Sequence, residues 1–243
     1  MYLVTIEEHP ELEDQLEPLI QSVWPPFMLN DPVANKYWGR LFSDFPECQI
    51  AMVEGDSIIG AGNSVPISWD KSLEDLPDEG WDWALETAME EADAGRQPAS
   101  LIGLQIVIAR DHQGKGLSSQ MVQKLKDIAT QKSLERVIIP VRPTLKHKYP
   151  LTPIERYIEW QKDDLPFDPW LRVHIRAGGQ IIKPCTRAMT ITGTVSEWES
   201  WTDMAFPESG EYIVPQALTP VTIDREQNKG TYIEPNVWVE HKA

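Results

Sequence analysis

The sequence has only two cysteines, Cys48 and Cys185, among 243 residues. Two isolated cysteines provide neither a disulfide framework nor the paired spacing of a structural metal site, so we expect no metal. No run of 18 apolar residues is present, which predicts that no helix crosses a membrane. The N-terminus also lacks the basic start and long apolar run of a secretory signal. These absences favour a cytoplasmic location.

Basic residues are scarce, with 22 Lys and Arg against 38 Asp and Glu, for a net charge of -16. An acidic protein is a poor ligand for nucleic acid, because phosphate neutralisation needs a basic surface. The charge is uneven: residues 1–109 carry a net -17, whereas residues 110–187 carry a net +7. The basic middle suits a small polyanion, although charge also fluctuates along any chain.

Apolar residues make up 41% of the chain, enough for a sizeable core in one domain over residues 1–243. Alternating and helical patterns predict strands and helices in mixed order. The expected strands are 2–6, 49–53, 57–67, 101–109, 136–141 and 180–192, and the expected helices are 11–23, a segment from Pro32, 117–132 and 169–177.

Two further segments flank this predicted core of residues 1–192. The acidic segment 70–98 is expected to be an insertion, a loop with a short helix at 82–94. Residues 193–243 are rich in aromatic residues and proline, a composition that predicts short strands and turns in a C-terminal extension packed on the core.

The most informative segment is Gln113-Gly114-Lys115-Gly116-Leu117-Ser118, between an apolar strand and an amphipathic helix. Glycines let the backbone approach a ligand closely, and the free amides of a helix start favour an anion. A Walker A loop would need glycine at Ala109 and a hydroxyl residue at Gly116, and a dinucleotide fingerprint would need glycine at Ser119. The segment matches neither of these two motifs, so it is either another kind of anion site or a loop without a ligand.

This strand–loop–helix segment resembles the pyrophosphate loop of the GNAT acyltransferase superfamily, whose pattern is Gln/Arg-x-x-Gly-x-Gly/Ala. Its last three positions are matched by Gly114-Lys115-Gly116, while Asp111 replaces the usual first residue. The resemblance implies an α/β fold with a mixed, twisted sheet, flanked by helices, whose two central parallel strands splay apart around the pantetheine arm. It implies acyl-coenzyme A as co-substrate, held by Ile106, Ile108, Gln113, Gly114, Lys115, Gly116, Leu117, Ser118 and Ser119.

The family's fourth helix commonly carries a tyrosine, four residues before a glycine, that protonates the departing thiolate. The matching position here is His174, four residues before Gly178. Histidine can donate or accept a proton near neutral pH. Helical spacing also aligns His174 with Trp170 and Ala177, so a packed core histidine is the alternative.

Nearly the whole chain is similar to the GNAT-like decarboxylase domains that load polyketide synthases from malonyl-coenzyme A. That resemblance implies a catalytic set of Trp38, Thr144, His174 and Arg187, and an acyl carrier protein as partner. The basic middle segment would then supply a local docking patch.

Three functions therefore stay open: a GNAT acyltransferase that uses acetyl- or another short acyl-coenzyme A, a malonyl-coenzyme A decarboxylase, and a non-catalytic acyl-coenzyme A sensor. An N-acetyltransferase needs a base, but the strand at 101–109 contains only Gln105 as a polar residue. The acceptor, the acyl group, the general base and the oligomeric state are not predicted by the sequence.

Overall fold

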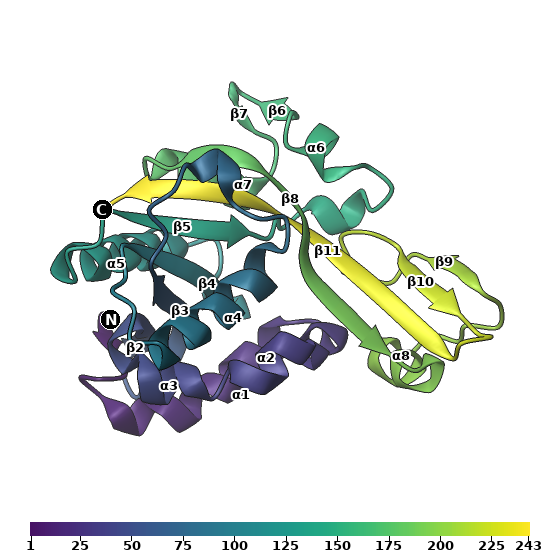
Figure 1. Ribbon diagram of the computed structural model, residues 1–243, viewed down its shortest axis with the longest axis horizontal. Helices are drawn as coiled ribbons and strands as arrows, with labels where there is room; N and C mark the ends of the chain where they lie inside the picture. The colour runs from purple at the N-terminus through teal and green to yellow at the C-terminus, as the bar shows by residue number, and fades with distance from the viewer.

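The computed structural model describes residues 1–243 as a mixed sheet with helices packed against it (Figure 1). The sheet consists of β1 (Tyr2–Thr5), β2 (Gln49–Glu54), β3 (Ser57–Ile67), β4 (Ser100–Ile108), β5 (Arg136–Val141), β8 (Gln180–Gly193), β9 (Gly210–Tyr212), β10 (Val221–Asp224) and β11 (Lys229–Lys242). Its order is β1-β2-β3-β4-β5-β11-β10-β9, with β8 paired to β11. A separate hairpin is formed by β6 (Gln161–Lys162) and β7 (Leu165–Pro166).

Eight α-helices accompany the sheet: α1 (Glu13–Val23), α2 (Pro32–Tyr37), α3 (Arg40–Asp44), α4 (Gly80–Asp93), α5 (Leu117–Gln131), α6 (Ile154–Tyr157), α7 (Pro169–Arg176) and α8 (Val195–Thr202). Leu16 and Ile20 of α1 pack with Val107 in one cluster, whereas Leu125 of α5 packs with Ile108 in the larger one. Neighbouring residues of a strand point to opposite faces, so α1 and α5 cover opposite sides of β4.

Two helices begin as their sequences predict, with an aspartate cap followed by proline in the first turn. Asp31 accepts a hydrogen bond from the backbone amide of Ala34, at 2.8 Å, at the start of α2. Asp168 accepts one from the amide of Trp170, at 2.9 Å, at the start of α7. Both carboxylates are buried, so these caps also fix the position of the helices against the core.

The sequence predicts two central parallel strands that begin side by side and then splay apart, and β4 and β5 confirm this prediction. They pair over only three residues each, from Ser100–Ile102 to Arg136–Ile138. Just beyond, Leu104 has no partner in β3 and forms a β-bulge, which bends β4 away. The indole of Trp81 donates a hydrogen bond to the Leu104 carbonyl at 2.8 Å and holds the bulge in place.

The C-terminal residues contribute a central strand, because β11 lies between β5 and β8 in the sheet. The segment predicted as an extension, residues 193–243, thus supplies part of the sheet itself. Beyond the other strands, β8 and β11 continue as a long ribbon that carries α8, β9 and β10 at its far end (Figure 1). The buried Trp198 of α8 packs there against Phe27.

The acidic segment 70–98 contains one helix, α4, whose first turns are apolar on the inner side. This helix packs against β3, β8 and α2. The predicted short helix at 82–94 is therefore present and begins two residues earlier, at Gly80. None of the helices in the chain combines the length and hydropathy needed to cross a membrane.

A Gly230→Ala substitution tests how tightly α8 packs on β11. A Cβ atom at Gly230 would overlap the buried indole of Trp198, so we expect the free energy of unfolding to fall by about 1–3 kcal/mol. Gly39→Ala is the control, because its Cβ atom meets nothing within 4 Å and its φ is -61°. Urea unfolding followed by tryptophan fluorescence should separate the two variants, and equal midpoints would contradict the packing described.

Candidate active site

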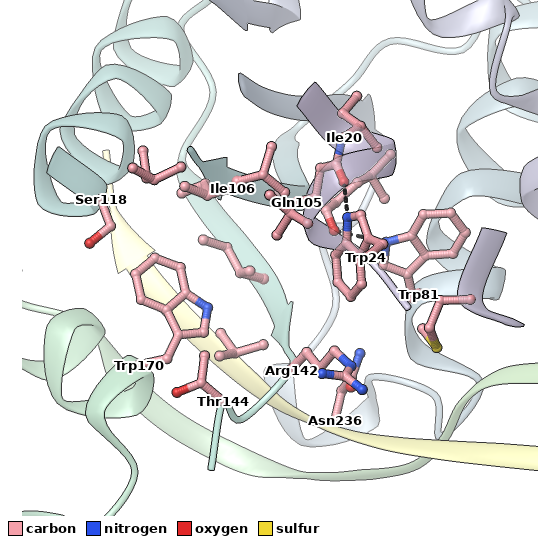
Figure 2. A pocket seen from close by; sticks show the side chains of 18 of the residues that line it. Ile20, Trp24, Trp81, Gln105, Ile106, Ser118, Arg142, Thr144, Trp170 and Asn236 are labelled. Atoms are coloured by element: carbon pink, nitrogen blue, oxygen red, sulfur yellow. Dashed lines mark hydrogen bonds between the residues drawn. The ribbon is translucent and has the colours of Figure 1, made fainter. Parts of the chain in front are cut away.

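A cavity of about 1000 Å³ opens where β4 and β5 part. Figure 2 shows Ser118 and Trp170 on one side of it, Trp24 and Trp81 on the other, and Ile106 between them. The start of α5 thus borders the first end of the cavity, and residues at the ends of α1 and α4 border the second. A long ligand can extend from one end to the other.

The loop before α5 is built to bind an anion with backbone amides. Gly114 and Gly116 have φ angles of 76° and 77°, a left-handed conformation that glycine adopts without strain. Gly116 is the N-cap of α5 and has no side-chain cap, so the amides of Leu117 and Ser118 are free, while the Ser119 amide donates to the Gly116 carbonyl at 3.2 Å. A Cβ atom at either glycine would meet nothing within 4 Å, which leaves open space for a ligand.

The residues predicted to hold coenzyme A line this cavity with one exception. Those that line it are Ile106, Ile108, Gln113, Gly114, Gly116, Leu117, Ser118 and Ser119. The side chain of Lys115 is exposed and lies outside the lining. The anion would therefore be held by the backbone and the helix dipole, with the lysine as a peripheral charge.

Asp111 stands where the resembling family has glutamine or arginine, and it binds a neighbouring side chain. Its carboxylate lies 2.8 Å from Nδ1 of His112, whose Nε2 lies 3.1 Å from Glu54. Hydrogen bonds with Asp111 and then Glu54 raise the pKa of His112 above its usual value. The two carboxylates thus tie the loop to the end of β2.

A chain of hydrogen-bonded side chains leads away from the second end of the cavity. The Trp24 indole donates to Oε1 of Gln105 at 2.8 Å, and Gln105 donates to Oδ1 of Asn63 at 2.7 Å. Asn63 donates in turn to Oε1 of Gln49 at 2.9 Å. Both ends of the Gln105 amide are occupied, so Gln105 orients Trp24 and has no role as a proton acceptor.

A buried carboxylate, Glu234, lines the cavity beside Arg142, whose guanidinium carbon lies 5.5 Å from the centroid of the Trp24 ring. Oε2 of Glu234 accepts hydrogen bonds from Nε of Arg142 at 2.8 Å and from the hydroxyl of Tyr232 at 2.9 Å. Arg142 also donates to the Gln216 carbonyl at 2.8 Å. Beside them, Asn236 donates to the Pro140 carbonyl at 3.2 Å. Glu234 and Asn236 both line the cavity.

Two of the four predicted catalytic residues line the cavity. Trp38 stacks on Trp81 with ring centroids 6.2 Å apart, at the second end. Thr144 follows β5, and its hydroxyl lies 3.5 Å from Oδ1 of Asp168. Their catalytic roles stay predictions.

The other two lie outside the cavity lining. His174 is fully buried behind Trp170, 4.3 Å away between ring centroids, and its Nδ1 lies 2.9 Å from Nε2 of His241. Burial, followed by the nearby His241, lowers its pKa to about 3. Arg187 pairs with Glu79 on the surface. This placement favours the packed-histidine alternative, and the catalytic role of each residue stays a prediction.

Sequence reasoning gave no role to several cavity residues, namely Trp24, Trp81, Glu234 and Asn236. One signal was available for two of them. Tyr232, Glu234 and Asn236 are spaced by two, so they share one face of a strand, and a carboxylate among buried neighbours needs a partner or a ligand. Because the composition of the tail predicts short strands and turns, this spacing does not by itself predict that the three side chains share a site.

Comparisons with known proteins agree with this geometry. The model of the Acetyltransferase (GNAT) family matches residues 11–150. The chain is similar to the arginine N-acetyltransferase avaD of Aspergillus versicolor, with 35% identity over 272 residues that cover 98% of this chain and 93% of that protein.

Two solved structures resemble the fold. The loading GNATL domain of CurA from Lyngbya majuscula has a TM-score of 0.63 at 18% identity, covering 99% of this chain and 96% of that one. The GphF GNAT-like decarboxylase in complex with isobutyryl-CoA has a TM-score of 0.59 at 14% identity, covering 100% and 99%. At these identities the likeness supports the fold alone.

A Gly116→Val substitution tests the anion loop. Valine in the left-handed conformation is strained, and its side chain would fill the space above the amides, so we expect coenzyme A affinity to fall at least about tenfold. Gly95→Val is the matched control, with a φ of 63° and equally open surroundings after α4. Calorimetric titration with coenzyme A should find the control unchanged, and undiminished affinity in Gly116→Val would contradict the site.

A His174→Gln substitution separates packing from catalysis. Because the histidine is buried outside the cavity, we expect a loss of stability of about 1–3 kcal/mol and a kcat of the folded protein within about threefold of the original. Thermal unfolding and steady-state kinetics on the same preparation provide both values. A drop in kcat of about 10²–10⁴-fold with unchanged stability would instead support the acid role.

Proposed function

The chain belongs to the GNAT acetyltransferase family, and from this premise we propose that it acetylates an amine nitrogen of arginine or a close derivative of arginine. It is an acyltransferase that uses an acyl-coenzyme A as its donor. We take arginine as the acceptor because this chain is similar over nearly its whole length to an arginine N-acetyltransferase. The observation that carries the proposal is the cavity, which connects the anion loop to a buried carboxylate, Glu234.

In this proposal the pyrophosphate of the coenzyme binds the amides between Gln113 and Ser119, and the pantetheine arm runs along β4. Past Ile102 the edge of β4 has no partner in β5, so its backbone groups, apart from the Leu104 and Ile108 carbonyls that accept from Trp81 and Gln113, can pair with the amides of the arm. Ile106 and Ile108 provide apolar contact on that edge. The thioester then lies beside the bulge at Leu104, between the two ends of the cavity.

The transfer itself needs a nitrogen with a free electron pair. The guanidinium of arginine stays protonated and has none to offer, whereas the α-amine loses its proton far more readily. The α-nitrogen forms a bond to the acetyl carbonyl carbon, the carbon–sulfur bond breaks, and one proton passes from nitrogen to the thiolate. Trp24, Trp38 and Trp81 shield this step from water and pack against the acceptor's methylene groups.

A malonyl-coenzyme A decarboxylase is the second candidate, because Trp38 and Thr144 line the cavity as that resemblance implies. The charged groups at the second end of the cavity favour a decarboxylase less than an arginine acetyltransferase. Arg142, a cation at the second end, is already paired with Glu234, and His174 lies outside the lining. A malonyl carboxylate there would face a buried carboxylate without a free cation, which is unfavourable at low dielectric.

Purified protein incubated with acetyl- or malonyl-coenzyme A, with and without L-arginine, tests the proposal. We expect coenzyme A and Nα-acetylarginine from acetyl-coenzyme A only when arginine is present, and unchanged malonyl-coenzyme A. Liquid chromatography with tandem mass spectrometry identifies the product and the acetylated nitrogen. Acetyl-coenzyme A formed from malonyl-coenzyme A without acceptor would support the decarboxylase, and binding without turnover would support a sensor.

A further inference from the structure

Two buried acceptor atoms on the cavity wall have no partner within the protein. Oε1 of Glu234 and Oδ1 of Asn236 make no hydrogen bond, although the side chains are only 0% and 2% exposed. The other oxygen of Glu234, Oε2, accepts hydrogen bonds from Arg142 and Tyr232. The amide nitrogen of Asn236 donates to the Pro140 carbonyl. Both side chains are thus held in place, each with one unused acceptor atom. A buried acceptor left unpaired is costly, so a donor in the ligand would be favoured here.

Two more carboxyl groups lie behind this wall. Asp31, at the start of α2, and Asp82, in the first turn of α4, are close enough to affect each other's protonation, and the charge of Glu234 affects both. Burial raises the pKa of Asp31 to about 6, and burial followed by the charge of Asp31 raises the pKa of Asp82 to about 8. At neutral pH the two therefore share one proton and keep one negative charge.

The charge of this region is not balanced within the protein. Arg142 neutralises Glu234, whereas no basic side chain is among the groups that shift the pKa of Asp31 or Asp82. The shared proton links the two carboxyl groups, and Oδ2 of Asp31 and Oδ1 of Asp82 have no other donor within the protein. No group of three or more acidic, cysteine or histidine residues has the arrangement of a metal site. An organic cation in the neighbouring cavity would supply the missing charge.

We propose that Glu234 and Asn236 bind the guanidinium group of the acceptor, with the charge shared by Asp31 and Asp82 balancing it from behind. The assignment rests on the proposed function for the identity of the acceptor. A guanidinium is planar and presents several N–H donors, which suits two fixed acceptor atoms on side chains two residues apart in β11. The cation is anchored at this wall, and the α-amine is left free to reach the thioester.

Arginine and citrulline provide the direct test, because citrulline replaces the guanidinium by a neutral urea of nearly the same shape. We expect calorimetry on protein saturated with coenzyme A to find arginine bound at least about tenfold more tightly than citrulline, as for a charge-assisted contact. This measurement needs no variant and no turnover. Equal affinities, or no binding of arginine, would overturn the assignment.

A matched pair of variants locates the contact. Glu234→Gln keeps the size and the acceptor for Arg142 but removes the charge, and the preference for arginine should fall below about threefold. Glu17→Gln makes the same change at an exposed carboxylate that also lines the cavity, and the preference should persist. Coenzyme A affinity should match that of the original protein in both, which controls for folding. An unchanged preference in Glu234→Gln would overturn the assignment.

Transfer measured on the same samples keeps the two proposals apart. If arginine binds with the expected preference but is not acetylated, the anchoring of the cation stands and the proposed reaction fails. If arginine and citrulline bind and are acetylated equally well, the reaction stands and the anchoring of the cation is overturned.

Discussion

The parting of β4 from β5 is the constraint on which the rest of the structure depends. Two parallel strands normally keep pairing, because a buried backbone group without a partner is unfavourable. Here the pairing ends after Ile102, where the bulge at Leu104 turns β4 aside. β5 is kept straight by β11, which pairs with it from Arg136 to Val141. The fold therefore maintains a gap in the middle of its own sheet, and the backbone edge left in that gap is available to a ligand.

The features that the sequence predicted well are local ones. The conformation of the loop from Gln113 to Ser119 depends on consecutive residues, since two glycines and a helix start suffice to expose amides. The strand–loop–helix–strand order around it likewise restricts the fold to a parallel crossover. These predictions, of a GNAT fold and of an acyl-coenzyme A donor, are confirmed by the structure and the relatives.

The second end of the cavity was not predicted because its residues are distant in the chain. Asp31, Asp82 and Glu234 meet only because α2 and α4 both pack on β8, which pairs with β11. No spacing pattern in the sequence predicts that these three carboxyl groups lie close together. The basic middle segment is a related case: Lys146 is fully buried and donates to the carbonyls of Tyr149 and Leu218. A count of charges along the chain does not reveal which of them reach the surface.

The hydrogen-bonded chain from Trp24 through Gln105 and Asn63 to Gln49 has a consequence for how this molecule can evolve. Each amide fixes the orientation of the next, so replacing one of these side chains would leave its neighbour in the chain without a hydrogen-bond partner. The second end of the cavity is formed in part by α4 and β11, whereas the anion loop precedes α5, so different segments of the chain form the two ends. Acceptor preference can consequently diverge among descendants while the donor stays the same.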